Sequence, residues 1–221
     1  DGIRVVGGSN VEIVNSNIQY TTQDGISATG TSTLNINNTN VQYNARVGIS
    51  LSQSTATITG GQVSFNANEG MRVMARSSVI AATVAIKSNG AAGVGLGNSH
   101  ARFDGSTISG NGTNASLVGH GFNASDSSVQ FFRGYITNNS GRGIFAAGGF
   151  FGLILSEVTG NGVHGVSLGL GAIGNISGGT ISGNNVFGLS LEMFSGAQMG
   201  GTTVLNNGNH GIWLSRASKL S

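Results

Sequence analysis

The chain of 221 residues contains no cysteine and no proline, and only 8% of its residues are charged. Without cysteine, disulfide bonds and thiolate metal sites are excluded. Ten basic and eight acidic residues give a net charge of +2, so the chain lacks the basic surface that binds nucleic acid. The scarcity of charge also argues against a disordered chain, and the lack of proline argues against collagen.

Long apolar runs are missing as well. No segment approaches the roughly 18 apolar residues of a membrane-spanning helix, so we expect no membrane insertion. The chain opens at Asp1 without the charged and apolar regions of a signal peptide. Both ends fall inside the repeat described below, with no capping segment, which favours a fragment of a longer protein with end-to-end contacts possible through its uncapped ends.

Glycine, by contrast, is abundant, with 39 residues. Ten of these glycines precede an apolar residue and recur at intervals of 22 or 23 residues, with a single interval of 28. A fixed period in this range is typical of solenoid proteins. The recurring glycines are Gly2, Gly25, Gly48, Gly70, Gly93, Gly121, Gly143, Gly165, Gly188 and Gly211.

Each interval contains three short apolar patches with fixed spacing. The first follows the glycine as an alternating pair, such as Ile49 and Leu51. The second ends ten or eleven residues after the glycine, and a β-branched residue such as Val63 stands five residues later. Three residues beyond it, in eight of the nine intervals, comes an asparagine. These are Asn44, Asn66, Asn89, Asn111, Asn139, Asn161, Asn184 and Asn207.

Three short strands per interval cannot bury their apolar faces alone, but stacked rungs can. The spacing therefore predicts an all-β solenoid, a single-stranded parallel β-helix of about ten turns of 22–23 residues in one domain, 1–221. The corner glycine would supply backbone conformations closed to other residues. The recurring asparagine would occupy a left-handed turn or form a ladder of stacked amides. The long interval predicts an inserted loop at 113–119.

The recurrent pattern resembles a known family. Residues 181–191 show it as ISGNNVFGLSL, an asparagine three residues after isoleucine and a glycine four residues later. It is similar to the right-handed parallel β-helix repeat of the pectin-lyase-like superfamily, and within it to repeats of bacterial secreted or surface proteins grouped with carbohydrate-binding and sugar-hydrolase β-helices. The resemblance implies the right-handed fold over the whole chain. It does not imply one chemistry, because the superfamily includes lyases, hydrolases, epimerases, tailspikes and adhesins.

Since core columns hold the fold together, candidate functional residues are sought in outward columns beside the first strand. Aligned by turn, His120, Arg142 and His164 form one column over three successive turns, with Asn123 and Phe145 beside them. The inserted loop comes directly before this cluster and is expected to overhang it. Near the C-terminal end, three aromatic side chains suit stacking against sugar rings, and these are Phe187, His210 and Trp213.

We therefore expect a secreted or cell-surface segment that recognises a polysaccharide or cell-surface glycan along the outer face of the sheet formed by the first strands. The residues expected to contact the glycan are Asn123, Phe145, Phe187, His210 and Trp213. The alternative is a polysaccharide lyase, with His120, Arg142 and His164 as catalytic residues that bind a uronate carboxylate and remove a proton. A third interpretation is that the chain is a structural spacer in an adhesin or autotransporter-like passenger.

The sequence gives less support to a hydrolase or to a metal-dependent enzyme. The four aspartates are spread over turns one, five and six, so neither the acidic calcium cluster of pectate lyases nor the three aspartates of polygalacturonases is matched. A hydrolase is accordingly less favoured than a lyase. Arg142 separates the histidines of the column, which disfavours zinc, and we expect no metal and no cofactor.

Overall fold

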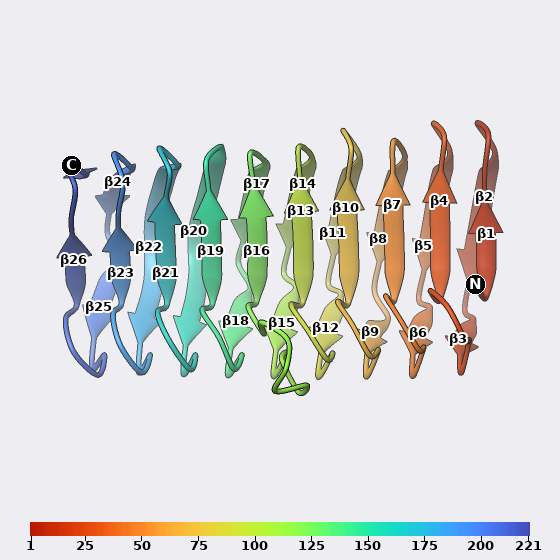
Figure 1. The fold of residues 1–221 in the computed structure, drawn as a ribbon, viewed down its shortest axis with the longest axis horizontal. Coiled ribbons are helices and arrows are strands. Elements are labelled where there is room, and N and C mark those ends of the chain that lie inside the picture. Colours follow the sequence, from red (N-terminus) through yellow and green to blue (C-terminus); the bar gives the residue numbers. More distant parts are fainter.

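The computed structural model describes all residues, 1–221, as a right-handed parallel β-helix (Figure 1). Ten first strands form one parallel sheet, and the second and third strands of each turn form the other, of 17 strands. The predicted fold class is confirmed, with nine complete turns and part of a tenth. The apolar patches predicted from the 22- and 23-residue spacing coincide with the strands, because only in-register stacking lets each short strand bury its apolar side chains.

The first strands lie side by side in chain order (Figure 1). They are β1 (Ile3–Val5), β4 (Ile26–Thr29), β7 (Ile49–Ser52), β10 (Met71–Met74), β13 (Val94–Gly97), β16 (Phe122–Ser125), β19 (Ile144–Ala147), β21 (Val166–Gly169), β23 (Leu189–Leu191) and β26 (Ile212–Leu214). We call the outer surface of this sheet the first-strand face.

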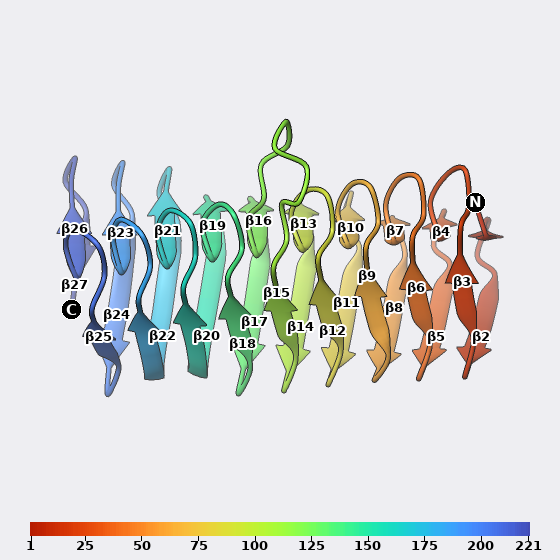
Figure 2. The ribbon, with the colours of Figure 1, turned by 90° about the horizontal axis from the view of Figure 1, so that it is seen from below.

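The second and third strands form the remaining walls of the rod (Figure 2). The second strands are β2 (Asn10–Val14), β5 (Thr33–Asn37), β8 (Thr55–Thr59), β11 (Ser78–Ala82), β14 (His100–Asp104), β17 (Ser128–Phe132), β24 (Gly196–Gly200) and β27 (Lys219–Leu220). The third strands are β3 (Asn17–Gln19), β6 (Asn40–Gln42), β9 (Gln62–Ser64), β12 (Ala85–Lys87), β15 (Thr107–Ser109), β18 (Tyr135–Thr137) and β25 (Thr203–Leu205).

In two turns the second and third strands run together as β20 (Phe150–Thr159) and β22 (Ile173–Ser182). Separate short strands were expected there. The two long strands pair along their whole length except at Leu155 and Gly178, both of which have a positive φ. The corner is thus a one-residue kink between paired segments rather than a break in the ladder.

The core runs along the rod axis as one cluster of 42 buried apolar residues. It includes four phenylalanines with edge-to-face or tilted contacts, Phe103, Phe122, Phe131 and Phe151. No helix in the structure is long and apolar enough to cross a membrane. Every apolar column predicted from the spacing contributes to this core, so the rod is stabilised by contacts between successive turns.

A ladder of asparagines runs beside the core. This is one of the two roles predicted for the recurring asparagine. Each Nδ2 except that of the last, Asn207, donates to Oδ1 of the next asparagine, at 2.9 Å from Asn44 to Asn66 and 2.8 Å from Asn111 to Asn139. None of these asparagines has a positive φ. Their place in the repeat therefore comes from hydrogen bonding between turns and not from a left-handed turn.

The corner glycines serve a different purpose from the predicted one. At Gly143 the backbone is not left-handed, but an added Cβ would lie 2.6 Å from Val158 Cγ1 and 2.7 Å from the Gly165 carbonyl oxygen. The same crowding recurs at Gly121 and Gly165. Glycine is required at this corner because two turns approach each other closely, so the expectation of a special backbone conformation there was wrong.

Gly143→Ala is expected to lower the free energy of unfolding by about 2 kcal/mol, because backbone and core atoms must move to admit the methyl group. Gly169→Ala is the matched control, since a Cβ there meets nothing within 4 Å. Denaturant titration of both variants measures the difference. Equal stability of the two variants would contradict the close approach.

Candidate functional site

The predicted site residues lie on the first-strand face in the expected register. Asn123 of β16 is paired with Phe145 of β19, and Phe145 with Ser167 of β21. Farther along the rod, Ser190 of β23 is paired with Trp213 of β26. The residues of the predicted column, His120, Arg142 and His164, precede these strands, at the corner where the recurring glycines lie. Stacking in register therefore brings residues that are 22 or 23 positions apart to neighbouring rungs.

The two histidines of the column are buried rather than outward-facing. His120 is 5% exposed and His164 is 8% exposed. Nδ1 of His120 accepts a hydrogen bond from the backbone N–H of Arg142 at 2.9 Å, and Nδ1 of His164 accepts one from Phe187 at 3.3 Å. Each imidazole thus satisfies a backbone donor in the next turn, a role that sequence reasoning did not foresee.

Burial lowers the pKa of His120 to about 4, with a further contribution from the positive charge of Arg142. The pKa of His164 is lowered by the same two causes, against an opposing effect of Glu192. An uncharged imidazole that accepts a hydrogen bond at Nδ1 carries its proton on Nε2. Neither ring therefore has a free lone pair with which to remove a proton from a substrate.

Arg142 lies over a hollow on the same face. Its guanidinium carbon is 4.9 Å from the centre of the Phe145 ring. The hollow has a volume of about 280 Å³, and its lining also includes Ser167, Leu170 and Glu192. Glu192 was not identified from the sequence, because it stands in the turn after β23, outside the two columns beside the first strand.

The two charged groups that line this hollow, Arg142 and Glu192, form no ion pair with each other. The three ion pairs of the chain lie elsewhere, at Arg46, Arg72 and Arg133. Nε of Arg142 is buried and has no hydrogen-bond partner, whereas Glu192 accepts a hydrogen bond from Ser190 at 2.9 Å. A buried guanidinium N–H without an acceptor is unusual, because an unsatisfied donor costs free energy. The Arg142 side chain therefore makes neither an ion pair nor a hydrogen bond within the chain.

The C-terminal aromatic residues form one continuous stack with His164. The ring of Phe187 is parallel to that of His164 at 4.7 Å, to His210 at 5.6 Å and to Trp213 at 5.5 Å. Trp213 is 39% exposed. The stack continues the first-strand face from the Arg142 hollow towards the C-terminal end.

The inserted loop does not overhang the histidines and Arg142. It protrudes between β15 and β16 (Figure 2). Backbone N–H groups of Thr113 and Asn114 bond to the carbonyl oxygens of Asn89 and Gly90, in an earlier turn. The loop therefore lines a hollow beside Phe65 and not the Arg142 hollow. The expected groove under the loop was wrong, since the direction in which a loop leans is not encoded in the repeat period.

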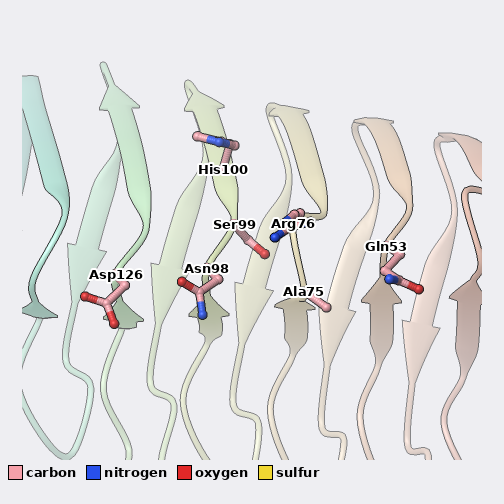
Figure 3. A pocket seen from close by; sticks show the side chains of 7 residues that line it. All are labelled: Gln53, Ala75, Arg76, Asn98, Ser99, His100 and Asp126. Carbon is pink, nitrogen blue, oxygen red and sulfur yellow. The ribbon is translucent and has the colours of Figure 1, made fainter.

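A further hollow, of about 600 Å³, lies at the corner between the first and second strands (Figure 3). It is lined by Gln53, Arg76, His100 and Asp126, among others. This group was also missed, because its members come from four turns and from the outer corner.

Beyond that corner, charged residues lie in β14 and directly after β17. Arg133 forms an ion pair with Asp104 and lowers the pKa of this carboxyl group below its ordinary value, mainly through a hydrogen bond. The guanidinium of Arg102 lies 4.5 Å from the centre of the Phe132 ring. Here each charged group has a partner within the chain, so this surface differs from the Arg142 hollow.

Comparisons with known proteins agree with the architecture. The family described as right handed beta helix region matches residues 1–157. No curated protein sequence matches the chain.

Three solved structures share the fold at low sequence identity. A pectate lyase superposes with a TM-score of 0.60 at 13% identity, over 86% of this chain and 52% of that chain. Tailspike protein 2 of an Escherichia coli O157:H7 bacteriophage gives 0.67 at 10% identity, over 96% and 38%. The A-module of a mannuronan C-5 epimerase from Azotobacter vinelandii gives 0.56 at 12% identity, over 100% and 84%. The chain thus spans about half the length of the pectate lyase and less of the tailspike.

Proposed function

The chain belongs to the right-handed β-helix family, and from that premise we propose that it recognises an acidic polysaccharide along the first-strand face without chemical turnover. Arg142 binds a carboxylate of the sugar chain, and Phe145 packs against the adjoining ring. The proposal includes an extracellular or cell-surface location, where such polymers occur. Asn123 and the aromatic stack of Phe187, His210 and Trp213 extend the binding surface along the rod.

The observation that carries this proposal is the Arg142 guanidinium at the hollow, which has no ion pair or hydrogen bond within the chain and is free to bind through its terminal nitrogens. A guanidinium presents two parallel N–H donors that match the two oxygens of a carboxylate. Phe145 offers an apolar surface beside the guanidinium, as sugar rings require. Two of the structural neighbours, the pectate lyase and the mannuronan epimerase, bear the names of polysaccharides, which is consistent with a polysaccharide ligand here.

Binding is favoured over β-elimination because the two histidines lack a free lone pair. A lyase would have to use Arg142 itself as the base, and a guanidinium is not deprotonated readily. The spacer interpretation is less favoured because a spacer has no need for a guanidinium that lines a hollow without an ion pair or hydrogen bond in the chain. The lyase and spacer alternatives are both decided by the experiment below.

Arg142→Gln is expected to weaken binding of trigalacturonate or an alginate oligomer by about 10- to 100-fold, because a charge-assisted hydrogen bond to a carboxylate is lost. Isothermal titration calorimetry measures the change. Arg133→Gln is the matched control, since Arg133 is paired with Asp104 on another wall of the rod.

The same samples are monitored for ultraviolet absorbance of an unsaturated uronate product. Unchanged absorbance is expected with every sugar. Product formation that disappears in Arg142→Gln would make the protein a lyase. Absence of binding by the unmodified protein to every acidic probe would favour the spacer instead.

A further inference from the structure

Three aromatic side chains form an exposed stack on a different edge of the rod. Tyr20, Tyr43 and Phe65 directly follow the third strands β3, β6 and β9. Their rings are nearly parallel, with centres 5.5 Å and 5.0 Å apart. Their exposed fractions are 71%, 43% and 43%. Large apolar groups of this kind, lined up on a surface, often mark a binding site.

The backbone beneath these rings is left-handed. The φ angles are 57° at Tyr20, 55° at Tyr43 and 55° at Phe65, a region that bulky residues rarely occupy. In the later turns the same position is held by small or amide residues, which tolerate this conformation better. These are Ser88, Gly110, Asn138, Gly160, Gly183 and Asn206, all with positive φ. The fold does not need an aromatic residue here, so the rings point to a role outside the fold.

The stack ends at Phe65 and leaves the outer side of that ring uncovered. The next two positions of the column are Ser88 and Gly110, neither of which can continue the stack. A hollow of about 500 Å³ opens at this point, lined by Phe65, Ser88, Thr113 and Asn114, among others. The last two belong to the inserted loop, which thereby forms one wall. A second hollow, of about 570 Å³, runs beside the three rings and shares Phe65.

The chemistry of the lining is uniform. Neither hollow is lined by an aspartate, glutamate, lysine, arginine or histidine. The polar groups offered are hydroxyls and amides, from Thr21, Thr22, Ser88, Thr113 and Asn114. An aromatic surface bordered by uncharged donors and acceptors fits a ligand with an apolar face and many hydroxyl groups.

We propose that this edge is a second saccharide site, specific for an uncharged hexopyranose chain. One sugar ring packs on Phe65, and its hydroxyl groups bond to the inserted loop. The site goes beyond the function proposed for the first-strand face and does not depend on it, because the two surfaces share no residue and differ in charge.

Phe65→Asn tests the site without disturbing the fold, because asparagine already holds this backbone position at Asn138 and Asn206. Cellohexaose and mannohexaose serve as neutral probes, and trigalacturonate serves as the acidic one. Binding is measured by isothermal titration calorimetry and by ligand-observed saturation-transfer NMR. We expect one of the neutral probes to bind and Phe65→Asn to weaken its binding about tenfold or more.

Tyr135→Asn is the matched control, since Tyr135 is 48% exposed but lines neither hollow, and it should leave neutral-sugar binding unchanged. Arg142→Gln should do the same, so failure of the acidic site is distinguishable from failure of this one. The proposal is overturned if neither neutral probe binds or if Phe65→Asn binds them equally well. It is also overturned if Phe65→Asn changes only the thermal stability or the sedimentation of the rod, because the stack would then be structural or self-associating.

Discussion

Asn139→Ala is expected to lower the free energy of unfolding by about 4 kcal/mol, the largest effect of any substitution considered for this protein. Oδ1 of Asn139 accepts hydrogen bonds from the N–H and Nδ2 of Asn111, at 3.1 Å and 2.8 Å. Its own Nδ2 donates to Asn161 at 3.0 Å and to the Ile108 carbonyl oxygen at 3.2 Å. Alanine removes these four hydrogen bonds and leaves the backbone N–H of Asn111 without its acceptor in the middle of the rod.

Asn138→Gly is the matched control for the ladder. Asn138 is the preceding residue, but it is exposed, has a φ of 56° and is replaced by glycine in other turns. Its substitution should change the free energy of unfolding by less than about 1 kcal/mol. Both variants are compared by denaturant unfolding with circular dichroism. Similar small losses in the two variants would contradict a structural role for the amide ladder.

Acidification from pH 7 to pH 4 is expected to reduce stability by about 3 kcal/mol through His120 alone. The folded protein holds the pKa of His120 at about 4, below its ordinary value of 6.5, because the ring is buried beside Arg142. Between these values the unfolded chain binds a proton that the folded chain does not. The contribution of His120 to stability is therefore fully present above pH 6.5 and is lost as the pH falls towards 4. His164 acts in the same direction.

His120→Asn isolates this effect, because an asparagine Oδ1 can accept the Arg142 backbone N–H without titrating. Asp24 already plays this role four turns earlier in the same column, where its Oδ1 accepts a hydrogen bond from the Val47 backbone N–H at 3.1 Å. The stability difference between wild type and variant should change by about 3 kcal/mol from pH 7 to pH 4 in urea titrations. Parallel pH profiles would show that His120 is charged in the folded state or exposed.

Much of the fold is predictable because it rests on a one-dimensional pattern. A β-branched residue five positions after the second patch and an asparagine three positions later can recur only if successive turns stack in register. The same argument places Asn123 beside Phe145, as found. The asparagine ladder was one of two roles that the sequence allowed, and only the structure distinguishes it from a left-handed turn.

Burial at the corners is not predictable from the period. The position before each glycine was expected to face outward, yet His120 and His164 are covered there and serve as hydrogen-bond acceptors. Residues of one column occupy equivalent places in successive turns but differ in exposure, since His120 and His164 are buried and His210 is exposed. The roles of the corner glycine and of Glu192 depend on such three-dimensional contacts as well.

The aromatic edge was detectable but overlooked. Tyr20, Tyr43 and Phe65 are separated by 23 and 22 residues, the interval of the repeat, and each follows a β-branched residue by two positions. This signal is missed when only the columns beside the first strand are considered. What the spacing could not provide is the hollow beyond Phe65, because it is completed by the inserted loop.

The most direct test of the account is a ¹H–¹⁵N spectrum of the arginine side chains during titration with trigalacturonate. Nε of Arg142 has no acceptor in the protein, whereas Nε of Arg133 donates to Asp104 at 3.0 Å. We predict that the Arg142 Nε–H signal moves in a saturable manner and that the Arg133 signal stays in place. Binding of the sugar with no movement of the Arg142 signal would contradict the proposed site on the first-strand face.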